Sequence, residues 1–262
     1  MDDQKRILEL CVDAGETLLA NGAEIYRAQQ TMEWIAHSYG ARSFHAYVLT
    51  NGLIASLDGP DGERAAVRGA PRVEMNLGRI SAVNELSREI SAGQVTLNDA
   101  FVRLAAIRAM RGYPVWMILL ASAVAAACFC YLFGGSAQDA LAAFVPGFAV
   151  GLFSRRLGRT REPLNKLVSN MLSAGVVALV SVICVHLLGM VHIVCSVNHV
   201  IIGGIVSLMP GIALTNGIRD VANCDYLSGT IRAIDAVLIA AGIALGVGIV
   251  LRIAALIPGV HI

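Results

Sequence analysis

The polar residues best suited to bind or move a solute follow an interruption in a long apolar stretch. Pro210-Gly211 comes shortly before Asn216, Arg219 and Asp220. Proline lacks a backbone donor and glycine relaxes a helix, so Pro210-Gly211 is expected to break a helix and leave polar backbone groups open. Broken helices at membrane depth often form solute sites. The segment therefore predicts a pathway for a small polar solute.

If a helix resumes after the break, Asn216, Arg219, Asp220 and Asn223 fall on one of its faces. That face combines an amide, a guanidinium and a carboxylate, a set that suits a zwitterionic or anionic metabolite. The guanidinium would hold the carboxylate of the solute in a forked hydrogen bond. The spacing fits equally well an ordinary cytoplasmic loop in which Arg219 helps to set the orientation in the membrane.

Further polar side chains lie in or beside apolar segments. A charge such as Asp235 is costly inside a span, so it is either a proton-coupling carboxylate or an interfacial partner of Arg232. A polar stripe at helical spacing, which serves the pathway or bonds neighbouring helices, consists of Asn165, Ser169, Asn170 and Ser173. The complete set of candidate pathway residues is Pro210, Gly211, Asn216, Arg219, Asp220, Asp225, Ser228, Asp235, Asn165 and Asn170.

Signatures of other classes of protein are missing from the sequence. It contains no HExxH, no GxxxxGK[ST] and no GxSxG, so a membrane protease, an ATP-driven pump and a lipase are disfavoured and no catalytic residue is expected. Its six cysteines form no CxxC pair, and its histidines have no acidic or cysteine partner at ligand spacing, so we expect no metal and no cofactor. A net charge of +1 without a basic stripe argues against nucleic acid as a partner.

The elements that must position these residues belong to two parts of the chain, one suited to water and one suited to lipid. Residues 1–112 hold 26 of the 39 charged side chains, whereas residues 167–218 hold none. Because about 20 apolar residues already cross the hydrocarbon of a bilayer, this run predicts a membrane protein. We expect a mainly α fold, an integral membrane bundle of about five transmembrane helices over residues 113–262, preceded by a small cytoplasmic α+β domain over residues 1–112.

The first domain mixes helical and strand patterns. Helical periodicity predicts two helices divided near Asn21-Gly22, and Asn51-Gly52 predicts a hairpin turn within Phe44 to Leu57. A third strand is expected at about 65–73. Helical periodicity returns from Leu77 to Met110, where Asn98-Asp99 is expected to cap the last helix.

Apolar segments predict the spans, and basic residues predict their orientation. The expected spans are about 115–133, 138–154, 167–188, 199–216 and 231–252. The second contains Pro146-Gly147, so it either uses part of the preceding loop or is broken. Lys and Arg gather in the loops before the first span, between the second and third, and between the fourth and fifth. Together with the lack of a signal peptide, this places the N-terminus in the cytoplasm and the C-terminus outside.

Two separated motifs resemble the bacterial threonine/serine exporter family. One runs from Pro210-Gly211 through Arg219-Asp220 to Ser228-Gly229, and the other is the segment 18–27 with Tyr39-Gly40 downstream. The resemblance covers nearly the whole chain. It implies a secondary transporter in the bacterial inner membrane that exports threonine or serine, with coupling to protons as the expected drive.

The resemblance also implies a partner. Family members are either one long chain of about ten spans or two subunits, and this chain resembles the N-terminal half or the larger subunit. Five spans put the two ends on opposite sides, so we expect a second five-span unit in inverted orientation, a homo-oligomer, or both. Some split members are associated with dicarboxylates such as succinate, which leaves that substrate class open. A non-transporting sensor or scaffold subunit is compatible with the same sequence, and so is an unrecognised intramembrane enzyme.

Overall fold

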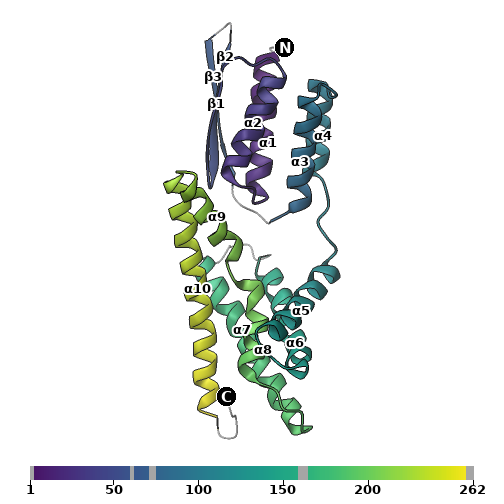
Figure 1. Cartoon of the computed structure of the whole chain (residues 1–262), viewed down its shortest axis with the longest axis vertical. Helices are drawn as coiled ribbons and strands as arrows, with labels where there is room; N and C mark the ends of the chain where they lie inside the picture. Colours follow the sequence, from purple (N-terminus) through teal and green to yellow (C-terminus); the bar gives the residue numbers. More distant parts are fainter. Residues whose placement is uncertain (1–2, 60–61, 71–74, 159–164, 258–262) are drawn as a thin grey trace. The chain divides into compact units, whose positions relative to one another are not determined.

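The computed structural model describes residues 3–59, 62–70, 75–158 and 165–257 (Figure 1). These residues divide into two compact units. The first unit comprises Met1–Gly112 together with Asp220–Ser228, and the second comprises Tyr113–Arg219 together with Gly229–Ile262. We describe each unit by itself.

The first unit is α+β. Its helices are α1 (Asp3–Ala20), α2 (Ile25–Ser38), α3 (Leu77–Ser91) and α4 (Leu97–Arg108). Within the described residues, the strands β1 (Phe44–Leu49), β2 (Gly52–Gly59) and β3 (Gly62–Gly69) form an antiparallel sheet in the order β1-β2-β3. The predicted hairpin is confirmed, but its turn is Thr50-Asn51 and not Asn51-Gly52, since Gly52 is the first residue of β2 and pairs with Leu49. The third strand begins and ends before the expected range, and residues 71–74 lie outside the described part.

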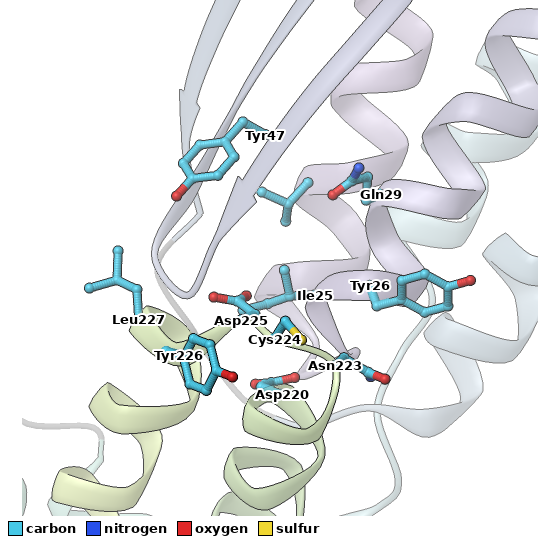
Figure 2. A pocket seen from close by; sticks show the side chains of 11 residues that line it. Ile25, Tyr26, Gln29, Tyr47, Asp220, Asn223, Cys224, Asp225, Tyr226 and Leu227 are labelled. Carbon is cyan, nitrogen blue, oxygen red and sulfur yellow. The ribbon is translucent and has the colours of Figure 1, made fainter.

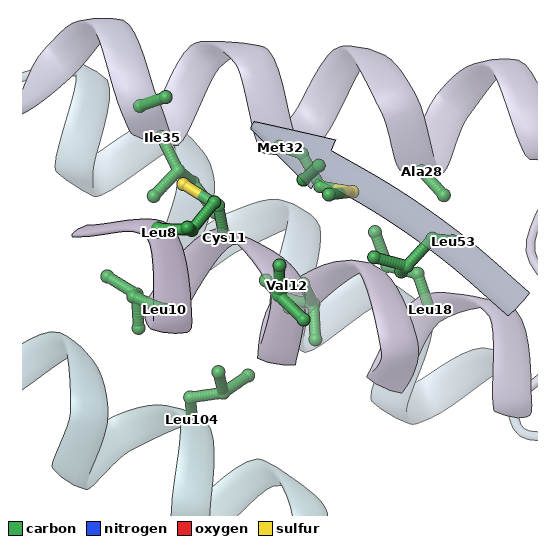
Figure 3. Close-up of a cluster of buried hydrophobic side chains, with 14 of the residues drawn as sticks. Leu8, Leu10, Cys11, Val12, Leu18, Ala28, Met32, Ile35, Leu53 and Leu104 are labelled. Carbon is green, nitrogen blue, oxygen red and sulfur yellow. The ribbon is translucent and has the colours of Figure 1, made fainter. Parts of the chain in front are cut away.

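Apolar side chains from α1, α2 and β2 form the core of this unit (Figure 3). Leu18 of α1, Met32 of α2 and Leu53 of β2 are fully buried together. A side chain at Gly15 would place its Cβ 2.4 Å from the sulfur of Met32, so the glycine lets α1 and α2 approach closely. Burial raises the pKa of the Cys11 thiol, which fits a small core hydrophobe and not a reactive thiol.

The start of α4 corrects one expectation. The cap of this helix is Thr96, whose hydroxyl oxygen accepts the amide of Asp99 at 3.2 Å and donates to the Asp99 carboxylate at 2.7 Å. The predicted cap at Asn98-Asp99 is therefore wrong by two residues. Asp99 instead completes the capping interaction from inside the first turn.

The second unit is a bundle of apolar helices. Among the described residues, four helices are long and apolar enough to cross a membrane: α5 (Val115–Leu132), α6 (Ala137–Leu157), α7 (Lys166–Met190) and α10 (Tyr226–Ala255). A fifth crossing results if the bent pair Val197–Leu208 and Gly211–Ala222 is one span. This pair consists of α8 (Val197–Ile205), the 3-10 turn η1 (Val206–Leu208) and α9 (Gly211–Ala222), with a bend of 54°. Helix α6 is continuous through Pro146-Gly147, and it is long enough to span because it starts at Ala137, within the expected loop.

Small residues let these helices touch backbone to backbone. A Cβ on Gly203 of α8 would lie 2.5 Å from the carbonyl oxygen of Ala126 on α5. On α10, a Cβ on Gly246 would lie 2.1 Å from the carbonyl oxygen of Met171 on α7, and Gly242 is similarly close to Leu167. Because lipid tails are as apolar as the helices, such close packing is a main source of association in membranes.

We expect Gly246→Ala to destabilise the bundle while Gly248→Ala does not. The methyl group at 246 meets backbone that can give way only if α7 and α10 separate, at a cost of about 1–3 kcal/mol. Gly248 lies on the same helix, and a Cβ added there meets no atom within 4 Å. Thermal unfolding of the detergent-purified variants measures the difference. Equal melting temperatures for the two variants would contradict this account of the contact.

Candidate substrate pathway

The break in the fourth apolar segment lies between η1 and α9. Met209 is extended there, with φ of −64° and ψ of 134°, and α9 starts again at Gly211. The carbonyl of Pro210 accepts the amide of Leu214 at 3.0 Å, while the hydroxyl of Thr215 donates to the carbonyl of Gly211 at 2.9 Å. The new helix thus satisfies these carbonyls, whereas its first amides have no acceptor within the helix.

Helices α9 and α10 form a hairpin that is tightest at Gly217. A Cβ at this position would lie 3.2 Å from the carbonyl oxygen of Gly229 and 3.3 Å from the Cβ of Arg232. Arg232 is only 4% exposed on α10, although it was expected in the loop between spans. The sequence gives no signal for its burial, because an arginine at the end of an apolar segment resembles a topology signal.

The four residues of the expected polar face of α9 differ in burial. Asp220 is 4% exposed, Asn216 is half-buried, and Arg219 and Asn223 are exposed. Burial of a carboxylate is costly unless charges or hydrogen bonds compensate. Among these four residues, Asp220 therefore depends most on compensating charges or hydrogen bonds from its surroundings.

Asp225 and Ser228 have a structural role at the start of α10. Asp225 lies directly before the first helical residue, and its carboxylate accepts the amide of Ser228 at 3.1 Å. This is the geometry of a helix cap, which satisfies one open amide and places a negative charge at the positive end of the helix.

The remaining candidates make local contacts around the start of α7. Lys166 donates to the Asp235 carboxylate at 2.6 Å, so Asp235 pairs across helices with a residue that sequence reasoning did not single out. Asn165 caps α7 by accepting the amide of Leu167, and the Asn170 amide donates to the carbonyl of Lys166. The stripe also bonds helices to each other, since the hydroxyl of Ser154 on α6 lies 3.3 Å from that of Ser173.

A pocket of about 450 Å³ lies in the first unit (Figure 2). It is lined by α2, β1 and the turn between α9 and α10, through Ile25, Tyr26, Gln29, Tyr47, Val48, Asp220, Asn223, Cys224, Asp225, Tyr226 and Leu227. The pocket thus brings two of the candidate residues, Asp220 and Asp225, together with side chains of α2 and β1. Sequence reasoning did not assign a role to Tyr47 or Gln29, because nothing local in the sequence links them to the turn.

A second cavity, of about 660 Å³, lies beside the break in the second unit. It is lined by Met209, Pro210, Gly211 and apolar residues of α8, α9 and α10. Four of the α10 residues are small and four positions apart: Ala236, Ala240, Ala244 and Gly248. This apolar lining suits a helix or an acyl chain and not a polar metabolite.

One buried carboxylate outside the candidate set joins α6 to α8. Asp139 is 4% exposed and accepts the Ser136 amide and hydroxyl at 2.8 Å each and the Ser196 amide at 2.6 Å. Ser136 in turn accepts the Asp139 amide, which completes a capping box. The Ser-x-x-Asp pattern before an apolar run is a recognised sign of such a box, so the sequence contained this signal.

These features define a multi-span membrane protein with an interrupted helix, buried charges at a helical hairpin and a polar pocket. Interrupted helices of this kind are characteristic of secondary transporters. The chain belongs to the threonine/serine exporter family, since the family model described as "Putative threonine/serine exporter" matches residues 9–254.

Three relatives show the range of the family. The chain is 23% identical to a "Probable threonine/serine exporter" of Mycobacterium tuberculosis, over 95% of this chain and 46% of the relative. It is 23% identical to a "Threonine/serine exporter" of Corynebacterium glutamicum, over 93% and 50%. It is 21% identical to the "Probable succinate transporter subunit YjjP" of Klebsiella aerogenes, over 88% and 87%.

The chain spans about half the length of the two relatives named as exporters and most of the length of the Klebsiella protein. No solved structure matches the chain.

Substitutions at Asp225 separate its cap from its charge. We expect Asp225→Ala to destabilise α10 by about 0.5–2 kcal/mol, because the Ser228 amide loses its acceptor. Asn caps helices about as well as Asp, so Asp225→Asn is expected to unfold close to the wild type. Thermal unfolding of the purified proteins measures both. If Asn and Ala lower the melting temperature equally, the side chain does not act as a cap.

Proposed function

We propose that this chain is a five-span unit of a secondary transporter that exports small polar amino acids of the threonine/serine type across the bacterial inner membrane. In this proposal, the first unit lies in the cytoplasm, the C-terminal end of α10 lies outside, and a proton gradient drives export. The observation that carries it is the interruption at Pro210-Gly211 between η1 and α9, followed by the buried Asp220. Family membership and the names of two relatives support the substrate class.

Export of a dicarboxylate such as succinate is the second candidate. It is favoured by the Klebsiella relative, which is named a succinate transporter subunit and matches this chain over most of both lengths. Transport assays that offer threonine, serine and succinate in parallel distinguish the two substrate classes. A non-transporting sensor or scaffold would move none of them.

The proposed transporter includes a second membrane unit, carried on a longer chain or on a separate subunit. Two relatives are about twice as long as the matched region, and the third is named a subunit. If the bent pair counts as one span, a second five-span unit would be inverted relative to this one, an arrangement that many secondary transporters use for alternating access. The apolar cavity beside Pro210 and the small residues of α10 suit a helix of that unit.

We expect Arg219→Ala and Asp220→Asn to abolish export while the protein still reaches the membrane. Each removes a charge that follows the break, so the solute loses a charge-assisted partner. Efflux of preloaded threonine from cells that express both membrane units measures the effect. Glu85→Gln, an exposed change on α3, is the matched control and should export normally. Normal efflux from both pathway variants would remove these residues from the mechanism.

The proposed coupling role of Asp235 has its own control. Asp235→Asn removes the titratable carboxylate, whereas Lys166→Gln breaks the same ion pair and leaves the carboxylate in place. Both groups are partly exposed, so we expect either change to alter the stability by less than about 1 kcal/mol. In proteoliposomes with an imposed pH gradient, Asp235→Asn should lose the response to the gradient and Lys166→Gln should keep it. A retained response in both variants would exclude Asp235 as the coupling group.

A further inference from the structure

We propose that the 450 Å³ pocket of the first unit is a binding site for a zwitterionic α-amino acid with a small polar side chain. This inference rests on the proposed export function and names the site at which the solute is first held. The volume lies within the usual range for small-molecule sites, with room for a small amino acid and several waters. Nothing in the lining requires a metal or a cofactor.

The charges of the lining select for an ammonium group. Asp225 contributes a half-buried carboxylate, and the described lining residues include no lysine or arginine. It already accepts one amide, from Ser228, but a carboxylate has acceptor sites for several donors. Asp220 also lines the pocket, but it is 4% exposed and already has a partner. The charge of Asp225 repels a solute with two carboxylates and no ammonium. The lining therefore favours an amino acid over succinate.

The opposite group of the zwitterion has a complementary partner in α2. This helix starts at Ile25, a lining residue, and the side chain of its N-cap residue, Glu24, makes no capping hydrogen bond. Open amides and the helix dipole at an N-terminus favour a carboxylate. Figure 2 shows the two carboxylates at the α9–α10 turn, with Ile25 and Gln29 on α2 and Tyr47 on β1. A bound amino acid thus finds partners of opposite sign on different elements.

Neutral polar groups lie in the lining beside the apolar side chains of Ile25, Val48 and Leu227. The Gln29 amide nitrogen donates to Glu33 at 3.0 Å, which directs its carbonyl oxygen to accept from another donor. The phenols of Tyr47 and Tyr226 are exposed and both donate and accept. These groups suit the hydroxyl of threonine or serine better than an apolar side chain. The pocket also draws on both motifs by which the chain resembles its family, 18–27 and 210–229.

Binding of radiolabelled L-threonine to the purified full chain in lipid nanodiscs tests the site. Four competitors separate its parts: L-serine, succinate, an amino alcohol that lacks the carboxylate, and a hydroxy acid that lacks the ammonium. We expect L-serine to compete well. Succinate and both half-analogues should compete at least about tenfold less, because each forgoes a charge-assisted hydrogen bond.

Asp225→Asn is the decisive variant, because it keeps the helix cap and removes the charge. We expect it to weaken threonine binding about tenfold or more at an unchanged melting temperature, whereas Glu85→Gln binds as the wild type does. Wild-type binding by Asp225→Asn, or equal competition by succinate, would overturn the site. The export function is tested separately: efflux of threonine that persists in Asp225→Asn leaves the transporter standing without this site, and absence of any efflux from the wild type refutes the transporter itself.

Discussion

An open backbone cannot face lipid, and this constraint governs the second unit. The helix interrupted at Pro210-Gly211 leaves amide groups that neighbouring protein or a solute must satisfy. Directly after the break, α9 packs against α10, because Gly217 lets it lie against the backbone at Gly229. The same hairpin carries the buried Arg232, and Asp225 caps the start of its second helix. The charged residues of the hairpin are therefore placed by the helix that resumes after the break.

Close backbone contact is the second requirement, since the hydrophobic effect does not hold helices together inside a bilayer. Gly242 and Gly246 bring α10 against α7, while Gly203 brings α8 against α5. Polar contacts add direction at the helix ends, where Asp139 ties α6 to α8 and Lys166 pairs with Asp235. The first unit follows ordinary soluble rules, with a core of fully buried apolar side chains on α1, α2 and β2.

Local signals in the sequence predicted local structure well. The hairpin at Asn51 and the break at Pro210-Gly211 each depend on a few adjacent residues, and both occur, although the turn of the hairpin is Thr50-Asn51. Contacts between residues distant in sequence could not be predicted, because hydrophobic periodicity identifies the buried face of a helix but not the element that packs on it. Lys166 and Asp235 are 69 positions apart, and Tyr47 of β1, which lies outside both motifs, lines the same pocket as Asp225. The cap of α4 was predicted wrongly because two good capping residues, Asn98 and Asp99, lie close behind the true cap at Thr96.

In the proposed transporter, the bent pair α8–α9 forms a single crossing, so that the two ends of the chain lie on opposite sides of the membrane. Labelling with a membrane-impermeant thiol reagent tests it most directly, in a variant whose native cysteines are replaced. We place single cysteines at Asp58 in the first unit and at Leu256 after α10, which are both exposed. We expect the reagent to label Leu256→Cys in intact cells and to label Asp58→Cys only after permeabilisation. Protection of both positions until permeabilisation would mean that the bent pair re-enters the membrane from one side, and would contradict the account.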